Sequence, residues 1–515
     1  MEAAIAANAV LGVVEPMSNG IGGDLFAIYW EAQTGKLTAI NASGWAPKAL
    51  TIDYLKARST NMPNEGVHSV TVPGCVDGWA KLHERFGKLT WRELFLPAIY
   101  YAENGFPVTE IIHEQWRNGV SKLSADSNGR RIFLRDGVPP RVGEKFRNPE
   151  LGAALKLIAS GGAKAFYRGP IAKAILATCD RLGGTMSAAD LSDFSSEWVT
   201  PISTEYRGWT VYELPPNGQG IAALEMLNIL ENFPISSYGP RTPEDLHVKM
   251  EAQKLAYADL LRYVADPHFS RIPVSGMLSK AYARQRAALI DHDRARCDAA
   301  PGDPPPSAGD TIYLAAVDRE GNIASLIQSL YLGFGSGVVV DQYGFHLQNR
   351  GGLFKLDPNH PNALAPRKRP LHTIIPAFME KGDLHMGFGI MGGFNQAQAH
   401  VQFVSNVVDF GLNIQAALEA PRFTKLTFGG CDFMIESRVP ADVRQVLLGK
   451  GHQLEVLGDF SSQMGGGQAV IHDSAAKVNY GASSPRKDGA AIPEPPPYFA
   501  TQSTRRPASA AGSRR

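Results

Sequence analysis

The chain has 515 residues, a hydrophobic fraction of 44%, a charged fraction of 20% and a formal net charge of +1. These values are typical of a soluble globular protein with several domains or one large layered domain, and they argue against nucleic acid or an anionic membrane as a partner. No apolar run reaches the roughly 18 residues that a membrane-spanning helix needs.

Cysteine usage and the N-terminal segment bear on the compartment. The cysteines are far apart and none belongs to a CxxC pair, so we expect neither a disulfide framework nor a thiolate zinc site. The first residues are apolar but lack the positive start and the cleavage site of a signal peptide. We expect a cytoplasmic protein, with a periplasmic or secreted one left open. The four cysteines are Cys75, Cys179, Cys297 and Cys431.

The first half of the chain is mostly helical by its apolar periodicity. Two neighbouring apolar runs joined by the turn EAQTG are expected to form strands, and a third strand runs into the Gly/Pro turn PPNGQG. Helices are expected at residues 1–14, 51–118, 149–195, 221–232 and 243–295, and strands at 22–30, 36–43 and from Trp209.

A proline-rich stretch, CDAAPGDPPPSAGD (297–310), separates this half from a strand-rich half and is expected to be a linker. The last residues, from about 496, are expected to be disordered. A helix-rich half followed by a strand-rich half predicts an α+β fold with helices packed over stacked sheets. Strands are expected at 311–318, 322–329, 336–349, 373–379 and 383–390, and helices at 396–411 and 413–420.

The segment GDTIYLAAVD (309–318) places a threonine directly before an apolar run. Alternate residues of a strand face opposite sides, so Thr311 and Tyr313 share one face and Ile312 and Leu314 share the other. Because both faces are apolar, the pattern predicts a buried central strand.

Thr311 allows three interpretations. A threonine can simply begin a strand. The chain could carry a serine-hydrolase nucleophile, although GFGSG (333–337) has its serine one position too late for GxSxG. Cleavage before Thr311 would instead free an α-amine that acts as base for its own hydroxyl, and the linker supplies a segment able to move away. The residues alone leave all three open.

Several collinear segments carry a resemblance that favours the third interpretation. They are AAIAANAVLGVVEPMSNGIGGDLFAIYW, VPGCVDGWAKLHERFGKLTWRELFLPAIYYAENGFPV, PPNGQGIAALEMLNILE, GDTIYLAAVDREGNIASLIQS, FGSGVVV, APRKRPLHTIIP, MGGFNQAQAHVQ and EAPRF. Over nearly its whole length the chain resembles the gamma-glutamyltranspeptidase family of N-terminal nucleophile hydrolases. The resemblance implies a four-layer αββα sandwich. It also implies a proenzyme that cuts itself between Asp310 and Thr311 into a large chain (1–310), truncated at its N-terminus, and a small catalytic chain (311–515).

The resemblance also assigns catalytic roles. Thr311 would attack an amide carbonyl, form an acyl-enzyme and pass the acyl group to water or to an amine. Ser329 stands where the family has a second threonine that hydrogen-bonds the nucleophile. Gly392 and Gly393 correspond to the pair whose backbone N–H groups stabilise the oxyanion. The mechanism implied by the resemblance requires no metal and no organic cofactor.

Five positions differ here from the glutathione-cleaving members that the chain resembles, and two of these positions hold the glutamyl end there. An arginine that binds the α-carboxylate and an aspartate that binds the α-amine are both lost, which argues against glutathione as the substrate. The positions are Ser43 for the arginine, Leu353 for the aspartate, His372 and Thr373 for a serine pair, and Leu330 or Tyr331 for an asparagine.

Arg350 offers a replacement, because its planar fork suits a substrate carboxylate, and His372, Thr373 and Tyr331 are expected to bind substrate beside it. The motifs LQNRG and HTIIP resemble a branch with gamma-glutamyltransferase-like proteins and oxamate amidohydrolase. A solvated or structural arginine and a hydrogen-bonded core histidine are the alternatives for Arg350 and His372.

We therefore expect an autoprocessed amidohydrolase or acyltransferase that acts on gamma-glutamyl compounds or similar small carboxylate-bearing amides. An oxamate amidohydrolase, a cephalosporin-type acylase and an unprocessed non-catalytic relative are the alternatives. The expected partners are a small amide, water or an amine acceptor, and the two chains of one precursor, with no nucleic acid and no membrane. A homo-oligomer stays open.

Overall fold

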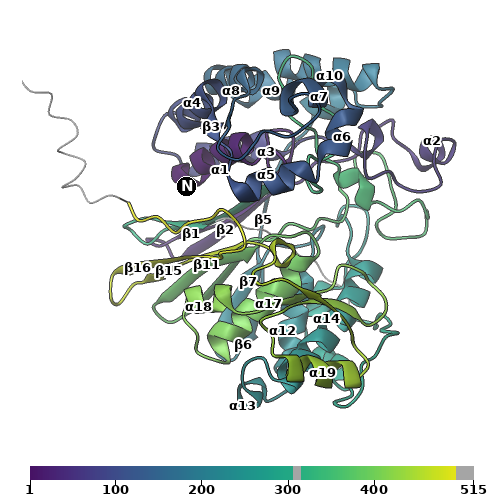
Figure 1. Ribbon diagram of the computed structural model, residues 1–515, viewed down its shortest axis with the longest axis vertical. Helices are drawn as coiled ribbons and strands as arrows, with labels where there is room; N and C mark the ends of the chain where they lie inside the picture. Colours follow the sequence, from purple (N-terminus) through teal and green to yellow (C-terminus); the bar gives the residue numbers. More distant parts are fainter. Residues whose placement is uncertain (305–314, 495–515) are drawn as a thin grey trace, which may run out of the picture.

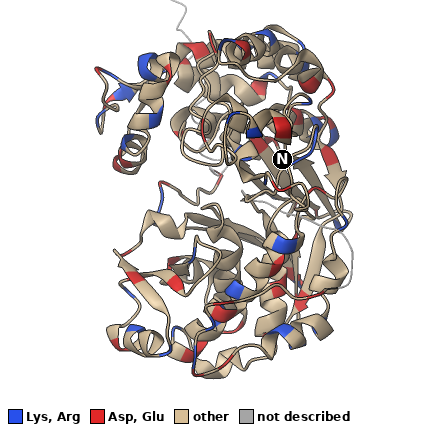
Figure 2. Ribbon diagram, turned by 90° about the vertical axis from the view of Figure 1, so that its right-hand side faces the viewer, with Lys and Arg blue, Asp and Glu red and all other residues tan. Residues whose placement is uncertain are grey.

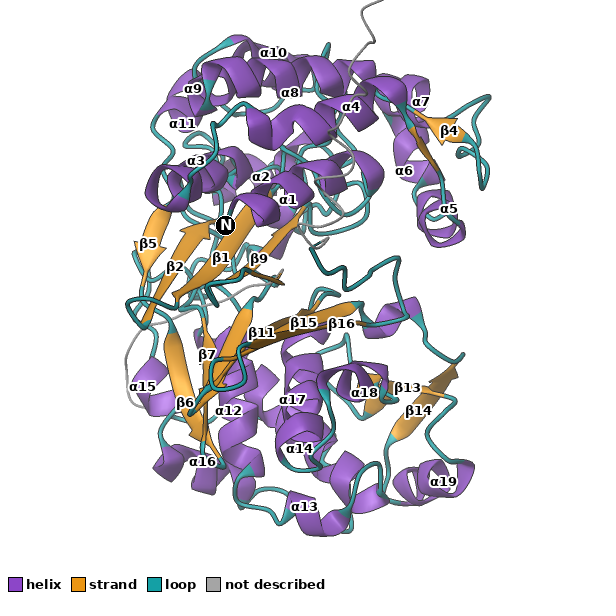
Figure 3. Ribbon diagram, turned by 90° about the vertical axis from the view of Figure 1, so that its left-hand side faces the viewer, coloured by secondary structure: helices purple, strands orange, loops and turns teal. Residues whose placement is uncertain are grey.

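The computed structural model describes residues 1–304 and 315–494. Two stacked antiparallel sheets form its centre, and helices cover the outer face of each sheet (Figure 1). The view from the side shows the four layers in sequence (Figure 3). The predicted αββα sandwich is thus confirmed. Asp310, Thr311 and the tail from about residue 496 lie outside the described residues.

The first sheet places β1 at its centre, paired with β2 on one side and β9 on the other. Phe26 and Ile28 of β1 face the second sheet, whereas Leu25 and Ala27 face the outer helices. The strand is apolar on both faces because each face is covered. In spatial order the strands are β5 (Glu197–Val199), β2 (Lys36–Ala42), β1 (Asp24–Glu31), β9 (Ile323–Ser329) and β8 (Ala315–Val317).

The second sheet packs against the first through side chains such as Phe378, whose ring stacks on Trp30 of β1, whereas Phe388 faces the outer helix layer and contacts Phe403. Two smaller sheets lie outside the sandwich. In spatial order the large sheet contains β16 (Val478–Ser483), β15 (Gly467–Asp473), β11 (Leu384–Ile390), β10 (Ala377–Lys381), β7 (Trp209–Glu213) and β6 (Ile202–Tyr206). The small sheets are β12 (Phe423–Thr424) with β13 (Asp432–Glu436) and β14 (Gln453–Leu457), and β3 (Phe106–Pro107) with β4 (Lys145–Phe146).

The helices over the first sheet come from the first 192 residues and share one core with the outer face of that sheet. Trp79 and Trp116 are among its largest fully buried side chains. The helices are α1 (Glu2–Val14), α2 (Ile52–Lys56), α3 (Cys75–Phe86), α4 (Leu96–Asn104), α5 (Glu110–Arg117), α6 (Val120–Ala125), α7 (Ser127–Phe133), α8 (Pro149–Gly161), α9 (Ala163–Tyr167), α10 (Pro170–Arg181) and α11 (Ala188–Ser192).

The helices over the second sheet surround the fully buried α12. Thr242 caps the long α14 by accepting a hydrogen bond from the backbone N–H of Asp245. The helical pattern expected over 243–295 is broken into three helices with Pro267 and Pro273 between the first two, as expected for residues that cannot donate a backbone hydrogen bond. The helices are α12 (Gly220–Leu230), α13 (Ile235–Tyr238), α14 (Pro243–Tyr263), α15 (Val274–Met277), α16 (Lys280–Ala287), α17 (Asn395–Val408), α18 (Ile414–Glu419) and α19 (Ala441–Gly449).

Two strand predictions were wrong. The described part of the strand after the linker, β8, lies at the edge of its sheet and not at the centre. Both its faces are apolar because Ala315 packs toward the second sheet and Ala316 toward the outer helices. The predicted strand 336–349 forms turns with one isolated bridge, Val339 to His346. Left-handed backbone at Gln342 and Gly344 bends this segment back on itself.

Both sheets combine strands from the two halves of the sequence. β9 and β8 join β1, β2 and β5 in one sheet, and β7 and β6 extend the second sheet beside β10. Basic and acidic residues are distributed over the upper and lower parts of the molecule (Figure 2). None of the helices in the described part of the chain is both long and apolar enough to cross a membrane.

Candidate active site

Asp24, the first residue of β1, is fully buried at the end of the first sheet. Its Oδ1 accepts hydrogen bonds from the backbone N–H groups of Gly44 (2.9 Å) and Gly74 (3.1 Å) and from Nε2 of Gln348 (2.7 Å). Burial raises the pKa of Asp24 to about 7, although the charge of Arg350 and these hydrogen bonds oppose the rise. The Asp24 carboxyl group therefore joins three separate chain segments by hydrogen bonds inside the fold.

His372 completes the contacts of this carboxylate. Its Nε2 lies 3.1 Å from Oδ2 of Asp24, and its Nδ1 lies 3.4 Å from the backbone nitrogen of Ile374. Because a backbone N–H can only donate, Nδ1 is the acceptor and Nε2 carries the proton that is given to Asp24. Burial and the charge of Arg350 lower the pKa of His372 well below 6.5. His372 is thus a neutral, hydrogen-bonded core histidine, the alternative stated from the sequence.

Arg350 is fully buried next to this pair and is not a solvated arginine. Its Nη1 donates to Oγ1 of Thr373 at 2.6 Å, and its guanidinium carbon lies 4.9 Å from the ring centroid of Tyr331. Among the described residues, Nε and Nη2 have no hydrogen-bond partner. Burial lowers the pKa of Arg350 to about 10, against the opposing effect of Asp24. The group stays charged and has two N–H groups to offer a ligand.

Ser329 ends β9 directly opposite Asp24 of β1. Its Oγ accepts a hydrogen bond from the backbone N–H of Tyr331 at 2.8 Å, which leaves the hydroxyl proton free to be donated. Tyr331 has a left-handed φ of 83°, a conformation that costs about 1 kcal/mol or more in a non-glycine residue and brings its ring over Arg350. The sharp turn after β9 therefore places the hydroxyl and the cation together.

Gly392 and Gly393 form the loop between β11 and α17, with φ values of 128° and 61°. Gly392 is exposed, and a side chain at Gly393 would meet nothing within 4 Å. Within the described residues neither backbone N–H makes a hydrogen bond, so both can point at a bound oxygen. Such a pair of free donors is what an oxyanion site needs.

Gln219 links the glycine loop to the arginine. Its Nε2 donates to the backbone oxygen of Gly393 at 2.8 Å and also to the backbone oxygen of Thr373. Thr373 in turn accepts from Arg350 through its hydroxyl. One buried side chain thus fixes the spacing between the loop and the cationic group.

Ser43 and Leu353 stand where the resemblance places the arginine and the aspartate that bind a glutamyl group, and neither carries a charge. Ser43 is buried, donates its hydroxyl to Oδ1 of Asn41 at 2.8 Å and accepts from Nδ2 of Asn217 at 3.1 Å. Leu353 lies in the turn that begins at Arg350, and its backbone oxygen accepts from Asn362. Both residues make hydrogen bonds within the fold.

One group in the described residues has the composition of a metal site: His247, Glu251 and His452, whose ligand atoms lie within 4.8 Å of one another. Its two histidines contact each other, since Nδ1 of His247 lies 2.8 Å from Nε2 of His452. Glu251 pairs with Nζ of Lys254 at 2.6 Å, which balances its charge without an ion. The group does not touch the residues of the candidate active site.

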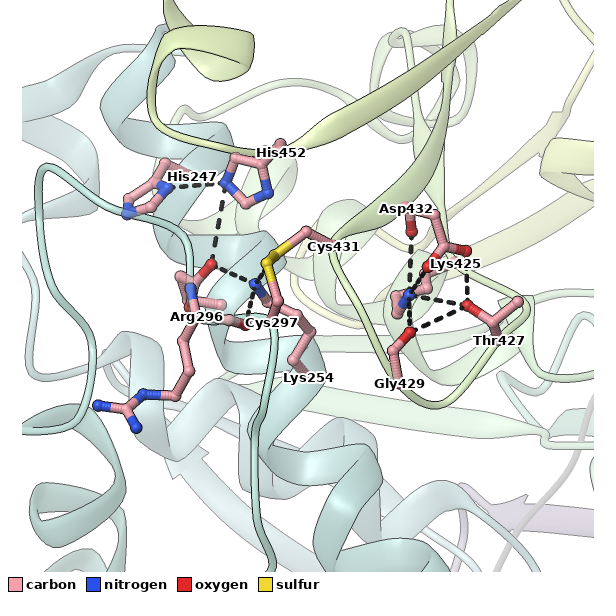
Figure 4. The surroundings of a disulfide bond; sticks show 11 residues. His247, Lys254, Arg296, Cys297, Lys425, Thr427, Gly429, Cys431, Asp432 and His452 are labelled. Carbon is pink, nitrogen blue, oxygen red and sulfur yellow. Dashed lines mark hydrogen bonds and ion pairs between the residues drawn. A yellow bond between two sulfur atoms is a disulfide. The ribbon is translucent and has the colours of Figure 1, made fainter.

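The structure contains one disulfide, which the expectation of no disulfide framework did not include. Cys297 and Cys431 are bonded across 134 residues of sequence (Figure 4), whereas Cys75 and Cys179 are free and buried. Sequence spacing could not show this pair, because the two cysteines meet only after α14 and the β12–β14 sheet have packed together. The absence of CxxC pairs says nothing about such long-range contacts.

The sequence argument also missed Asp24 and Gln219. The signal for Asp24 was an acid at the start of an apolar strand after two glycines. A Cβ at Gly22 would lie 2.1 Å from the backbone oxygen of His346, so this glycine lets the two chain segments approach closely. Gln219 carried no signal beyond its place in PPNGQG, immediately before α12.

Stacked antiparallel sheets between helical layers, with a hydroxyl, a glycine loop and a buried cation gathered at the strand ends, are the architecture of N-terminal nucleophile hydrolases. The sequence profile of gamma-glutamyltranspeptidase matches residues 1–494. The chain belongs to the gamma-glutamyltranspeptidase family, whose members are hydrolases and acyltransferases.

Three relatives show how the family divides. The chain is 37% identical to the glutathione hydrolase-like YwrD proenzyme of Bacillus subtilis, over 95% of this chain and 93% of that protein. It is 33% identical to the oxamate amidohydrolase proenzyme of Klebsiella pneumoniae, over the same shares. The crystal structure of cephalosporin acylase from Bacillus halodurans superposes with a TM-score of 0.89 at 42% identity and covers 95% of this chain and 90% of its own.

Proposed function

We propose that the chain is a proenzyme that cuts itself between Asp310 and Thr311 into a large chain of residues 1–310 and a small chain of residues 311–515. The proposal is supported by the register of β8 on β9, in which Ala315 pairs with Ser325 and Val317 with Ile323. Because the two strands are antiparallel, the first described residue of β8, Ala315, lies toward the end of β9 at which Ser329 stands. The freed α-amine would then serve as the base for the threonine hydroxyl.

In the proposed reaction, Thr311 Oγ1 attacks an amide carbonyl while its own α-amine takes the hydroxyl proton. The backbone N–H groups of Gly392 and Gly393 stabilise the oxyanion, a contribution of about 3 to 4 kcal/mol for one such donor in a characterised hydrolase. The amine leaves with a proton, and water or a second amine then releases the acyl group from the threonine. Ser329 holds the nucleophile through its free hydroxyl proton.

The substrate that we propose is a small amide with a carboxylate near the scissile carbonyl. One observation carries this proposal: Arg350 is buried and charged, its Nε and Nη2 have no hydrogen-bond partner within the described ranges 1–304 and 315–494, and Gln219 joins its partner Thr373 to the glycine loop. An arginine fork forms two parallel hydrogen bonds to a carboxylate. The Tyr331 ring, which covers the guanidinium, would move aside as the substrate enters.

Processing is tested on a denaturing gel under reducing conditions. Wild-type protein should give two bands, and Thr311→Ala should give one full-length band. Sequencing of the smaller wild-type product should begin at Thr311. A wild-type chain that stays intact after prolonged incubation would refute the cleavage, and it would favour an unprocessed non-catalytic relative.

Oxamate hydrolysis is a second candidate function. It is favoured by the neutral residues Ser43 and Leu353, because the α-amine of a glutamyl group would find no carboxylate at position 353 and its α-carboxylate would depend on Arg350 alone. A side-by-side assay of a gamma-glutamyl anilide and oxamate with the same wild-type preparation decides between the two. Higher kcat/KM for oxamate establishes the second candidate, and higher kcat/KM for the anilide removes it.

A further inference from the structure

The Cys297–Cys431 disulfide spans the proposed cleavage point, with Cys297 before residue 310 and Cys431 after residue 311. We propose that this bond joins the large and the small chain of the mature protein covalently, so that self-cleavage yields two polypeptides but one molecule. The inference rests on the proposed function for the position of the cut. The disulfide itself can be tested without any cleavage.

Backbone contacts hold the two cysteines together independently of their sulfur atoms. The backbone N–H of Gly430 donates to the oxygen of Cys297 at 3.1 Å, and that of Gln453 donates to the oxygen of Cys431 at 2.8 Å. Both segments therefore have backbone hydrogen bonds that do not involve the sulfur atoms. A cross-link between pre-positioned segments adds no requirement for backbone movement.

A buried charge network supports the same junction (Figure 4). Lys254 of α14 donates to the backbone oxygen of Arg296 at 2.6 Å, and its Nζ lies 3.5 Å from Sγ of Cys431. Glu251 pairs with Lys254 and accepts from the backbone N–H of Arg296 at 3.2 Å. The large-chain segment at Cys297 is thus attached to α14, and the disulfide extends this attachment to the small chain.

The chain remains attached to the large-chain helices beyond Cys297. Arg286 donates to the backbone oxygen of Ala300 at 2.9 Å, and the N–H of Gly302 donates to Oδ1 of Asp259 at 2.6 Å. The first part of the predicted linker, up to residue 302, is therefore held in place. Cleavage after residue 310 would release a short end without loosening the disulfide.

The bond forms by thiol–disulfide exchange with a small disulfide oxidant such as oxidised glutathione. The cysteine pair loses two electrons and two protons as its S–S bond forms, and the oxidant's S–S bond is reduced to two thiols. Cys297 is an exposed residue and Cys431 is buried, so exchange begins at Cys297. In reduction, attack on the sulfur of Cys297 expels the Cys431 thiolate beside the Lys254 ammonium.

The experiment compares reducing and non-reducing gels of wild-type protein treated with oxidised glutathione, with free thiols alkylated before denaturation. We expect two bands with reductant and one full-length band without it. Two bands under both conditions would overturn the covalent link. One band under both conditions would mean that cleavage fails, and the disulfide would then be judged from the peptide map below.

Variants separate the link from folding. Cys431→Ser should give two bands under both conditions, whereas the matched control Cys179→Ser, which removes a buried free thiol, should behave like wild type. A non-reduced tryptic map of uncleaved Thr311→Ala should contain the peptide of Cys297 joined to that of Cys431. Two alkylatable thiols per denatured non-reduced chain agree with the inference, and four would overturn it.

Discussion

Gly465 offers a sharp test of the oxyanion loop because it supports that loop without belonging to it. A Cβ at Gly465 would lie 1.8 Å from the backbone oxygen of Met391, the residue that precedes Gly392. Real Cβ contacts essentially never fall below 3.0 Å, so Gly465→Ala must displace the Met391 carbonyl or its own backbone by at least about 1.2 Å. Asn395, which donates to Met391 and Met464, ties the two segments together and limits the alternatives.

The expected magnitude follows from this displacement. A misplacement of about 1 Å in a catalytic group can cost roughly 100-fold in rate, so we expect Gly465→Ala to lower kcat by about 100-fold. The matched control is Gly382→Ala in the β10–β11 turn, which also has positive φ (56°) but has nothing within 4 Å of its Cβ. In both variants the alanine adopts a left-handed backbone conformation, which costs about 1 to 2 kcal/mol of stability. Only Gly465→Ala also introduces a steric clash.

Both variants are assayed for kcat and KM with whichever of the two test amides the wild type cleaves faster, alongside thermal unfolding and a processing gel. Gly382→Ala should keep kcat within about threefold, since its strain is remote from the loop. A folded, processed Gly465→Ala enzyme whose kcat equals that of Gly382→Ala would refute the assignment of Gly392 and Gly393 as oxyanion donors.

Three further predictions concern the residues around the loop. Arg350→Ala should raise KM for the carboxylate substrate at least about 10-fold, from the loss of a charge-assisted hydrogen bond of roughly 1.5 to 3 kcal/mol, with normal processing on the gel; failed processing would make Arg350 structural. Ser329→Ala should lower kcat about 10-fold whereas Ser329→Thr retains activity, and equal rates for all three enzymes would remove Ser329 from the site. Burial raises the pKa of Asp24 from 3.8 to about 7, so the folded state keeps a proton that the unfolded state loses, and stability should fall as the pH rises from about 4 to 7. Urea unfolding of the uncleaved Thr311→Ala chain should show this slope reduced by Asp24→Asn, and an unchanged slope would contradict the buried-carboxylate argument.

The four-layer sandwich was implied by the family resemblance, whereas the residue pattern predicted helices packed over stacked sheets. Phe26 and Ile28 alternate with Leu25 and Ala27, and two apolar faces can only mean two covered faces. The same reasoning failed for β8, since a strand with two covered faces need not have a neighbour on both edges. The strand prediction for 336–349 was wrong because its valines and Phe345 lie in a segment of turns, and the left-handed positions at Gln342 and Gly344 gave no periodic signal.

The candidate site was predictable only in part. Ser329, Arg350 and the two loop glycines could be proposed as site residues because collinear motifs carry a family's spacing. Asp24 was not predicted as a site residue because its hydrogen-bond donors, Gly44, Gly74 and Gln348, come from distant segments that no local pattern brings together. The disulfide was not predicted for the same reason, since its two cysteines are 134 residues apart.

The mixed strand order of the two sheets constrains how the protein can be made. β9 lies between β1 and β8, and β7 pairs with β10, so hydrogen-bonded ladders cross from one half of the sequence to the other in both sheets. Separately produced halves would each expose unpaired strand edges next to bare apolar surface, a combination that promotes aggregation. Synthesis as one polypeptide avoids this hazard, because both sheets can close before any peptide bond is broken.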